Sequence, residues 1–250
     1  MSWTHSALIA EVYNLDKPVG HSYGDVEYYT AALRGVTGPV LELACGNGRV
    51  LVPLLKAGYD MAGLDQSPHM IEICRRNADD LGYQPPLHVG DMANFQLPST
   101  FAAIVVPSGS VKDLDGREAF DSALASCREA LRPGGLLVMD VAPPVMAGAT
   151  TGPMRLWRRD DVLWTLQCVH LDFDSARNQV TEFLRYEKWR DGELLTTELH
   201  TFCIQHRSPD EVSEALVRAG FHDIHVTAGY NPASRPAARD DDWTFHAIRP

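Results

Sequence analysis

The sequence predicts an α/β fold built on a mostly parallel, Rossmann-like sheet. Strand-like and helix-like segments alternate through about the first 140 residues, which is typical of an open parallel sheet with right-handed crossovers. The apolar runs 101–106 and 136–141 are nearly continuous, as expected of strands buried on both faces. Beyond residue 150 the segments become long and β-rich, which predicts an antiparallel element added after the fifth strand.

Composition narrows the class of protein. The chain has 250 residues, of which 45% are hydrophobic and 22% charged, and this suits one α/β domain with an elaboration. A formal net charge of −11 argues against broad binding of nucleic acid or anionic membranes. Five cysteines without a CxxC or a Cys/His metal spacing indicate reduced thiols and no metal site. We expect a cytoplasmic monomer or homodimer, since neither a transmembrane stretch nor a signal peptide is recognisable.

Residues 1–35 predict two short helices, Ala7–Leu15 and Asp25–Leu33, separated by a Pro-Gly break. This segment is rich in tyrosine. The rings either pack the segment onto the domain or line a pocket with their hydroxyl groups, and the sequence leaves both interpretations open. The four tyrosines are Tyr13, Tyr23, Tyr28 and Tyr29.

The first strand leads into a glycine turn, in the stretch Val40-Leu41-Glu42-Leu43-Ala44-Cys45-Gly46-Asn47-Gly48-Arg49-Val50. Gly46 and Gly48 allow a sharp turn and a close approach of the backbone to a ligand. They fill two positions of a Gly-x-Gly-x-x-Gly nucleotide fingerprint, whereas Leu51 occupies the third. Taken alone, the stretch is either an ordinary strand-to-helix turn or the start of a nucleotide site.

The next elements follow the same alternation. The second strand, 59–65, ends in Asp65, at the position where an acidic residue accepts hydrogen bonds from ribose hydroxyls. Ser67-Pro68 is the better N-cap for the helix that follows. The fourth strand ends at the loop Pro107-Ser108-Gly109-Ser110, and a helix over 118–131 precedes the fifth strand. A ligand is expected outside the carboxyl ends of these strands.

Residues 154–206 predict a three-stranded antiparallel insertion, with strands at Val162–Phe173, Val180–Trp189 and Leu194–Gln205. Asp191-Gly192 is a strong hairpin signal between the last two. Ser208-Pro209-Asp210-Glu211 then predicts a capping box that begins a helix. Two final strands, 221–227 and 243–249, form a hairpin around the loop 231–242, and the last strand is antiparallel to the sheet.

Four motifs, in order and spacing, resemble those of the class I S-adenosylmethionine-dependent methyltransferases. They are Glu42-Leu43-Ala44-Cys45-Gly46-Asn47-Gly48, Gly63-Leu64-Asp65-Gln66-Ser67-Pro68-His69-Met70, Gly90-Asp91-Met92 and Leu131-Arg132-Pro133-Gly134-Gly135-Leu136-Leu137. The resemblance covers residues 38–142, and a missing third glycine is normal in this family. With the insertion and the tyrosine-rich leader, the chain resembles bacterial small-molecule enzymes, the sugar N,N-dimethyltransferases and glycine/sarcosine N-methyltransferases.

The resemblance implies S-adenosyl-L-methionine as cofactor. Glu42 would orient the loop or bind the methionine ammonium, Asp65 would accept the ribose hydroxyls, and Asp91 would accept from the adenine amino group. The implied cofactor-binding set is Tyr13, Glu42, Ala44, Cys45, Gly46, Asn47, Gly48, Asp65, Gln66, Met70, Asp91, Met92, Pro107 and Ser108.

The resemblance also implies a division of the chain. Residues 1–35 form a helical lid, 36–153 with 207–250 bind the cofactor, and 154–206 cover the acceptor site. Candidate acceptor-binding residues are Tyr23, Tyr28, Trp157, Trp164, Arg155, Arg158 and Arg159, although the tryptophans are more readily explained by packing of the insertion. No catalytic residue is assigned; His170, His200 and Tyr23 are the candidate bases.

The expected function is methyl transfer to nitrogen or oxygen of a small metabolite, in secondary metabolism, with no nucleic acid or membrane partner. Alternatives are C-methylation of a small acid and a non-catalytic sensor that binds S-adenosylmethionine. A nicotinamide-dependent oxidoreductase is disfavoured, because the third glycine and a Tyr-x-x-x-Lys motif are missing.

Overall fold

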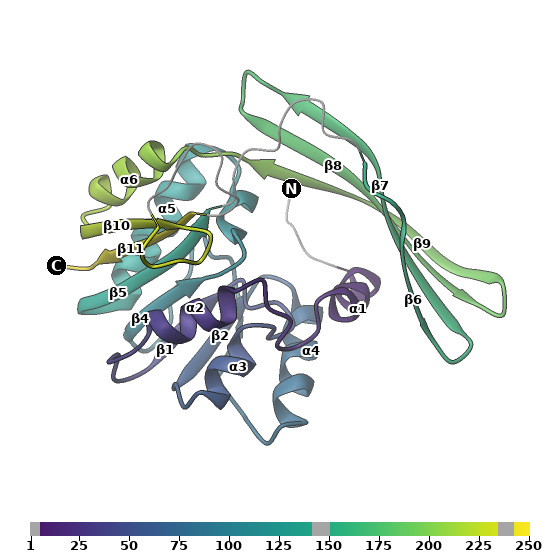
Figure 1. Cartoon of the computed structure of the whole chain (residues 1–250), viewed down its shortest axis with the longest axis horizontal. Helices are drawn as coiled ribbons and strands as arrows, with labels where there is room; N and C mark the ends of the chain where they lie inside the picture. The colour runs from purple at the N-terminus through teal and green to yellow at the C-terminus, as the bar shows by residue number, and fades with distance from the viewer. Residues whose placement is uncertain (1–5, 142–150, 235–242) are drawn as a thin grey trace.

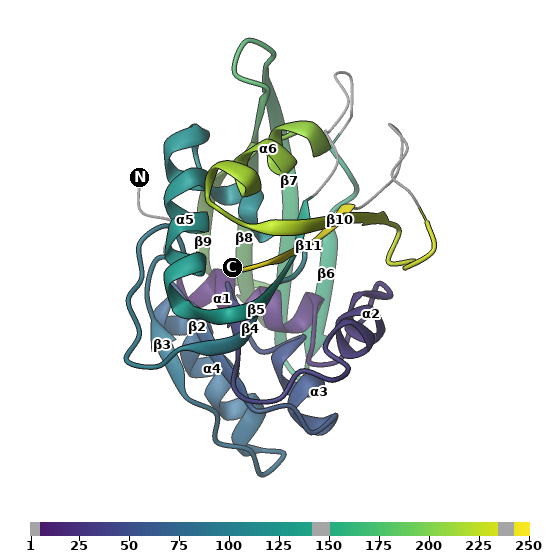
Figure 2. The same cartoon turned by 90° about the vertical axis from the view of Figure 1, so that its left-hand side faces the viewer.

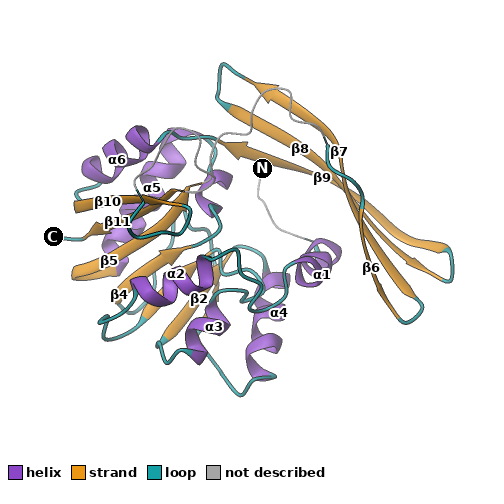
Figure 3. Ribbon diagram, in the orientation of Figure 1, coloured by secondary structure: helices purple, strands orange, loops and turns teal. Residues whose placement is uncertain are grey.

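A computed structural model describes residues 6–141, 151–234 and 243–250. Figure 1 shows a central sheet with helices on both faces and, beside it, a second, long antiparallel sheet. The predicted fold class is confirmed: the central sheet is mostly parallel, and its last strand in sequence is antiparallel to β5. Figure 3 separates the strands of the two sheets from the helices that pack on them.

The central sheet has seven strands in the order β10-β11-β5-β4-β1-β2-β3. Strands β1 to β5 pair in parallel, whereas β11 runs antiparallel to both β5 and β10. Residues 235–242, most of the loop expected between β10 and β11, lie outside the described residues. The bounds are β1 (Val40–Leu43), β2 (Met61–Asp65), β3 (Leu87–Val89), β4 (Phe101–Val106), β5 (Leu131–Val141), β10 (His222–Ala228) and β11 (Trp243–Ile248).

Side chains of β4 show how the sheet is buried on both faces. Ala103 and Val105 face one layer of helices, and Ile104 and Val106 face the other. The first layer is formed by α2 (Asp25–Ala32), α3 (Leu51–Lys56) and α4 (Pro68–Asp79). The second is formed by α5 (Gly116–Ala130) and α6 (Pro209–Arg218), which Figure 2 shows on the side away from α2 and α3. All six residues of β4 are buried, as their apolar character predicts.

The inserted sheet has four strands, so the expectation of three was wrong. It consists of β6 (Arg155–Arg159), β7 (Val162–Asp174), β8 (Gln179–Arg190) and β9 (Glu193–Gln205), hydrogen-bonded in that order. The missed strand, β6, is a short edge strand in which Trp157 pairs with Trp164. Three of its five residues are arginine and four are exposed, so it lacks the apolar alternation by which a strand is recognised. The turn predicted at Asp191-Gly192 connects β8 and β9, with positive φ at both residues.

Helix α1 (Ala7–Asp16) lies between the two sheets (Figure 1). Its residues Leu8, Ile9 and Val12 pack in a cluster with the apolar side chains of β7 and β8. Its residue Ala10 packs instead against α4, in a cluster with Met70 and Ile73. The helix therefore bridges the central domain and the inserted sheet.

Among the described residues, no helix is both long and apolar enough to span a membrane.

Candidate active site

The loop that follows β1 turns tightly at the carboxyl end of the sheet. Ala44, Gly46 and Gly48 all have positive φ, at 52°, 54° and 84°. The N–H of Gly48 donates to the carbonyl of Cys45 at 2.9 Å, which closes the turn. A Cβ at Gly48 would lie 2.9 Å from the Cys74 sulfur, so glycine is required there by close packing against α4 as well as by conformation.

Asp65 at the end of β2 holds this loop in place. One carboxylate oxygen accepts from the N–H of Gly46 at 2.9 Å, and the other accepts from the N–H of Ser67 at 2.8 Å. Ser67 itself caps α4, as predicted, by accepting from the N–H of Met70. Burial raises the pKa of Asp65, and the two N–H donors lower it in part. Each oxygen keeps a lone pair for a further donor, as a ribose hydroxyl would require.

Asn47 lies in the same loop but turns away from the cavity, toward α1. Its side-chain amide donates to Asn14 at 2.8 Å and to the carbonyl of Lys17 at 2.9 Å. Its backbone carbonyl accepts from Asn77 of α4 at 2.9 Å. The Asn47 side chain therefore ties the loop after β1 to α1, whereas the prediction was a contact with the cofactor.

Arg49, for which no role was predicted, is a buried charged group beside the loop. It forms a buried ion pair with Asp25 of α2; the exposed fractions of the two side chains are 4% and 1%. The same guanidinium donates to the carbonyl of His21 at 2.6 Å and to the Ser108 hydroxyl. It thus connects the leader to the loop after β4, where Ser108 has a positive φ of 63°.

Asp140 in β5 fixes the other side of that loop. Its carboxylate accepts from the Ser108 N–H at 2.9 Å, the Thr244 hydroxyl at 2.9 Å and the Tyr230 hydroxyl at 3.0 Å. Burial raises the pKa of Asp140 to about 7 despite these donors. Ser108 is therefore held from two sides, by Arg49 through its hydroxyl and by Asp140 through its backbone.

A cavity of about 330 Å³ opens between this edge of the central sheet and the inserted sheet. One wall belongs to the cofactor motifs and includes Ala44, Gly46, Asp65 and Met70. The opposite wall belongs to the insertion, and the end of α1 and the loop after β4 complete the lining. These further lining residues are Tyr13, Asp16, Lys17, Ser108, Ser110, Lys112, Asp113, Arg155, Leu166, Glu182, Leu184, Tyr186, His200, Phe202 and Ile204.

The predicted cofactor residues fall into two groups. Tyr13, Ala44, Gly46, Asp65, Met70 and Ser108 line the cavity together. Cys45 and Pro107 are buried behind it, Gln66 is half-buried next to Asp65, and Met92 packs against the core. Asp91 is exposed and accepts from the N–H of Ala93 at 2.8 Å. These cofactor assignments stay predictions.

Glu42 stands out by its burial. Glu42 is 3% exposed, and its Oε2 is buried without a hydrogen-bond partner among the described residues. Burial raises its pKa well above the usual range. An unsatisfied buried acceptor beneath the loop is suited to a hydrogen-bond donor that a ligand supplies.

Few of the predicted acceptor residues reach the cavity. Tyr28 packs α2 against the β10–β11 hairpin, with its hydroxyl 2.6 Å from Thr227 and 2.7 Å from His246. Tyr23 is 59% exposed, and its ring lies 5.6 Å from the Arg49 guanidinium. Trp157 packs in the α1 cluster, and Trp164 is buried there. Arg158 and Arg159 are exposed.

Of the remaining candidates, Arg155 lines the cavity and pairs with Asp16 at 2.6 Å. His200 lines it as well, and burial lowers its pKa. His170 is absent from the lining and packs against the ring of Phe183. In the described ranges, no group of three or more His, Cys, Asp and Glu side chains could hold a metal ion.

Sequence reasoning missed the charged residues Lys17, Lys112, Asp113 and Glu182. Asp113 ends η1 (Ser110–Asp113), the short 3-10 helix after β4. Burial raises the pKa of Asp113 to about 7, and it lowers that of Lys17 to about 8. A signal for Lys112 and Asp113 existed, because they follow directly on a loop already assigned to the site.

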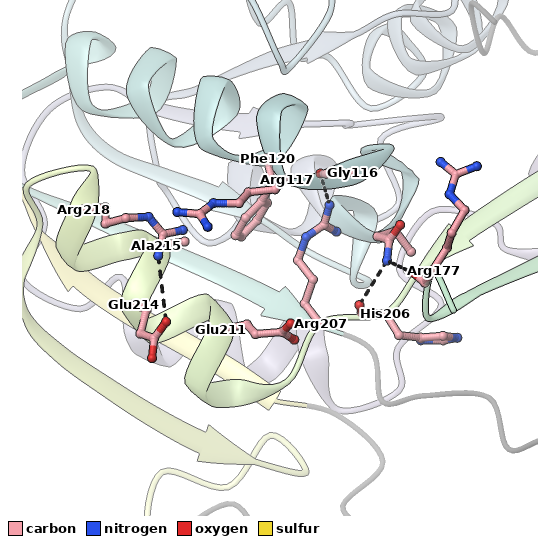
Figure 4. Close-up of a pocket in the computed structure, with 11 residues that line it drawn as sticks. Gly116, Arg117, Phe120, Arg177, His206, Arg207, Glu211, Glu214, Ala215 and Arg218 are labelled. Atoms are coloured by element: carbon pink, nitrogen blue, oxygen red, sulfur yellow. Dashed lines mark hydrogen bonds and ion pairs between the residues drawn. The ribbon is translucent and has the colours of Figure 1, made fainter. Parts of the chain in front are cut away.

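A second cavity lies between α5, α6 and the end of β9, and Figure 4 shows its lining. Its centre is Arg207, whose guanidinium lies 4.5 Å from the Phe120 ring. Arg207 donates to the carbonyls of Val111, Leu114 and Gly116 at 3.0, 2.6 and 2.8 Å. These bonds fasten the η1–α5 connection from behind, so this cavity supports the loop that faces the first one.

Comparison with known proteins agrees with this geometry. A family model described as a methyltransferase domain matches residues 40–135. The chain is 38% identical over 101 residues to the dTDP-3-amino-3,4,6-trideoxy-alpha-D-glucopyranose N,N-dimethyltransferase of Streptomyces venezuelae. That alignment covers 40% of this chain and 41% of the relative, which is less than half of either.

Two solved structures match nearly the whole chain. The crystal structure of Streptomyces venezuelae DesVI has a TM-score of 0.74 and 25% identity, and the match covers 96% of this chain and 98% of that one. The glycopeptide N-methyltransferase MtfA, complexed with S-adenosylmethionine, has a TM-score of 0.60 and 27% identity, with coverage of 93% and 95%.

The sheet order, the glycine loop and these similarities show that residues 40–135 form a methyltransferase domain with the class I, S-adenosylmethionine-dependent fold. Within that class it is similar to N-methyltransferases of sugars and glycopeptides. S-adenosylmethionine is therefore the cofactor, and it supplies an activated methyl group. The residues present fit it, because Glu42 offers an unsatisfied acceptor and Asp65 offers free lone pairs at the edge of the cavity.

Proposed function

We propose that this enzyme transfers methyl groups to the amine nitrogen of a small amino sugar that carries an anionic group. The observation that carries the proposal is the composition of the cavity beyond the cofactor loop. Its wall presents the cationic side chains of Lys17 and Lys112, and that of Arg155 in an ion pair with Asp16, beside apolar and aromatic ones. Such a wall suits a small acceptor that combines a polar ring with phosphate or another anionic substituent.

Nitrogen is favoured over oxygen for a chemical reason. A neutral amine attacks a methyl sulfonium without further activation, whereas a sugar hydroxyl needs a strong base or a metal. The sugar-methylating relative and the structural neighbour MtfA are N-methyltransferases, which supports the same choice. The carboxyl groups in the cavity, Asp113 and Glu182, also suit an amine more than a second anion.

The test is transfer of label from methyl-labelled S-adenosylmethionine to a dTDP-3-amino-deoxyglucose and to its 3-hydroxy counterpart. We expect label on nitrogen of the amino sugar, located by mass spectrometry, and none on the hydroxy sugar. Methylation of the hydroxy sugar on oxygen, or of a small carboxylic acid on carbon, would contradict the proposal. Cofactor binding without transfer to any compound of a metabolite extract would favour a sensor.

The inserted sheet gives a sharper test of where the acceptor lies. Leu184→Trp would fill space within the cavity, whereas Leu195→Trp, at a position 49% exposed on β9, is the matched control. We expect Leu184→Trp to raise KM for the acceptor at least tenfold and to leave the affinity for S-adenosylhomocysteine, measured by calorimetry, unchanged. Equal acceptor kinetics in the two variants would place the acceptor elsewhere.

A further inference from the structure

One carboxyl group in the cavity has an oxygen that the fold leaves unsatisfied. Asp113 is the last residue of η1 and lines the cavity, and its Oδ1 is buried without a hydrogen-bond partner in the described part of the chain. A buried acceptor left unsatisfied destabilises the fold, so it indicates a place where a ligand or a reaction uses the group. Of the other cavity carboxylates, Asp65 accepts from the N–H groups of Gly46 and Ser67, and Asp16 pairs with Arg155; Glu182 on the inserted sheet is considered below.

Asp113 is also held at a defined place. Arg207 fastens the carbonyls on both sides of it, those of Val111 and Leu114, from the cavity drawn in Figure 4. Ser108, in the loop between β4 and η1, is held from two sides by Arg49 and Asp140. The loop that presents Asp113 is therefore anchored at its start and its end, which is the arrangement that a group acting on a reacting atom requires.

We infer that Asp113 is a catalytic residue, the general base that takes the proton from the acceptor's ammonium group before methyl transfer. This inference rests on the proposed function, because it needs an amine acceptor. The Asp113 carboxylate accepts one proton from R–NH3⁺ and becomes a carboxylic acid, and the acceptor becomes R–NH2. The nitrogen lone pair then forms a bond to the methyl carbon, and the electron pair of the broken carbon–sulfur bond stays on sulfur. Asp113 later returns its proton to water.

The electrostatic surroundings suit this role. Near neutral pH an alkylammonium is mostly protonated and cannot attack. Burial, together with the negative charge of Asp65, raises the pKa of Asp113, and the positive charges of Lys112 and Lys17 lower it. The resulting pKa is about 7. A base with that pKa is matched to neutral conditions. The other titratable and charged groups around the cavity, from the elements that pack about it, are Tyr13, Asp16, Lys17, Asp65, Lys112, Arg155, Glu182, Tyr186 and His200.

Glu182 is the rival within the cavity. It lies on β8 in the inserted sheet, and burial raises its pKa while Lys112, Arg155 and Lys17 lower it. Asp113 lies on η1, which follows β4 of the central sheet directly, whereas Glu182 lies on a strand of the inserted sheet. Asp113 is therefore the carboxyl group on the cofactor side, where the reacting nitrogen must lie, and Glu182 is on the acceptor side.

The experiment compares the wild-type enzyme with Asp113→Asn, with the dTDP-3-amino sugar named above as probe. At pH 7 we expect kcat/KM to fall about a hundredfold. Because solvent deprotonates the amine at high pH, the deficit should shrink steadily toward pH 9.5. Asp113→Glu should restore part of the rate. Asp115→Asn, an exposed aspartate two residues further on, is the control and should match the wild type.

A second measurement does not depend on turnover. In the presence of S-adenosylhomocysteine, Asp113→Asn should weaken binding of the amino sugar about tenfold and leave binding of the 3-hydroxy sugar unchanged. Equal effects on both sugars would overturn the inference, because they would indicate a structural role. A loss of rate in Asp113→Asn that does not change with pH would also overturn the inference. The same holds if Glu182→Gln or His200→Gln, and not Asp113→Asn, loses the pH dependence of kcat/KM. If the wild type methylates no amine, the proposed function itself fails, and the two failures are distinguishable.

Discussion

Replacing Arg49 with methionine should destabilise the protein strongly. The variant would leave the Asp25 carboxylate, whose side chain is 1% exposed, without its cationic partner. Asp25 would keep the N–H groups of Tyr23 at 3.1 Å and Val26 at 3.0 Å and the Ser22 hydroxyl at 3.4 Å, but no opposite charge. Breaking one side of a buried pair costs about 3–5 kcal/mol, and we expect a loss of that size.

Urea unfolding at pH 7, followed by circular dichroism, measures the loss, and a double-mutant cycle identifies its cause. Arg49→Met combined with Asp25→Asn removes both charges, so the double variant should be more stable than the sum of the single losses by about 2 kcal/mol. Arg117→Met breaks an exposed pair with Asp121 and should cost less than about 1 kcal/mol. Additive losses in the cycle would refute the reasoning.

The pH dependence of the same variant follows from Asp25. Burial alone would raise its pKa, but the hydrogen bond and charge of Arg49, with the N–H groups of Tyr23 and Val26, lower it below the usual value. A carboxyl group with a lowered pKa contributes stability that is complete above its unfolded pKa, about 4, and is lost as the pH falls through its folded pKa. The gap between wild type and Arg49→Met should therefore narrow as the pH falls from 7 toward 3. A constant gap would show that charge is not the cause.

Two further changes probe the cofactor side. A Cβ at Gly63 would lie 2.8 Å from Cys45, Leu51 and Leu87 side-chain atoms, so Gly63→Ala should cost about 1–3 kcal/mol in urea unfolding. Gly152→Ala, where nothing lies within 4 Å, is the control, and equal stability of the two would contradict the packing argument. Asp65→Ala should weaken S-adenosylhomocysteine binding by about 1–3 kcal/mol in calorimetry, because charge-assisted bonds are lost. Unchanged affinity in a folded variant would remove Asp65 from the site.

The loop after β1 and the end of β2 were predictable because their geometry restricts which residues the backbone can carry there. At position 48 any residue other than glycine would bring its Cβ against Cys74. Asp65 must end β2, because from there its carboxylate reaches the N–H of Gly46. Such constraints leave the same residue types at the same spacing. The central strands were equally readable, because strands such as β4 are buried on both faces and are apolar throughout.

The cavity wall on the inserted sheet was less predictable, because it is formed by side chains that alternate along strands. Glu182, Leu184 and Tyr186 on β8 line the cavity at every second position, as do His200, Phe202 and Ile204 on β9. The period of two was visible, but the sequence does not indicate which face of an isolated sheet is covered. Among the acceptor candidates predicted on β6, Arg155 lines the cavity, whereas Trp157 packs against α1 and Arg158 is exposed.

Helix α1 makes the two halves mechanically dependent on each other. Asn47 of the cofactor loop holds the carbonyl of Lys17 at the end of this helix, while Lys188 of the inserted sheet holds Glu11 in its middle at 2.9 Å. A movement of the loop after β1 would therefore be transmitted through α1 to the inserted sheet. If the methyl donor changes the affinity for the acceptor in this way, linkage requires the acceptor to change the affinity for the donor by the same factor.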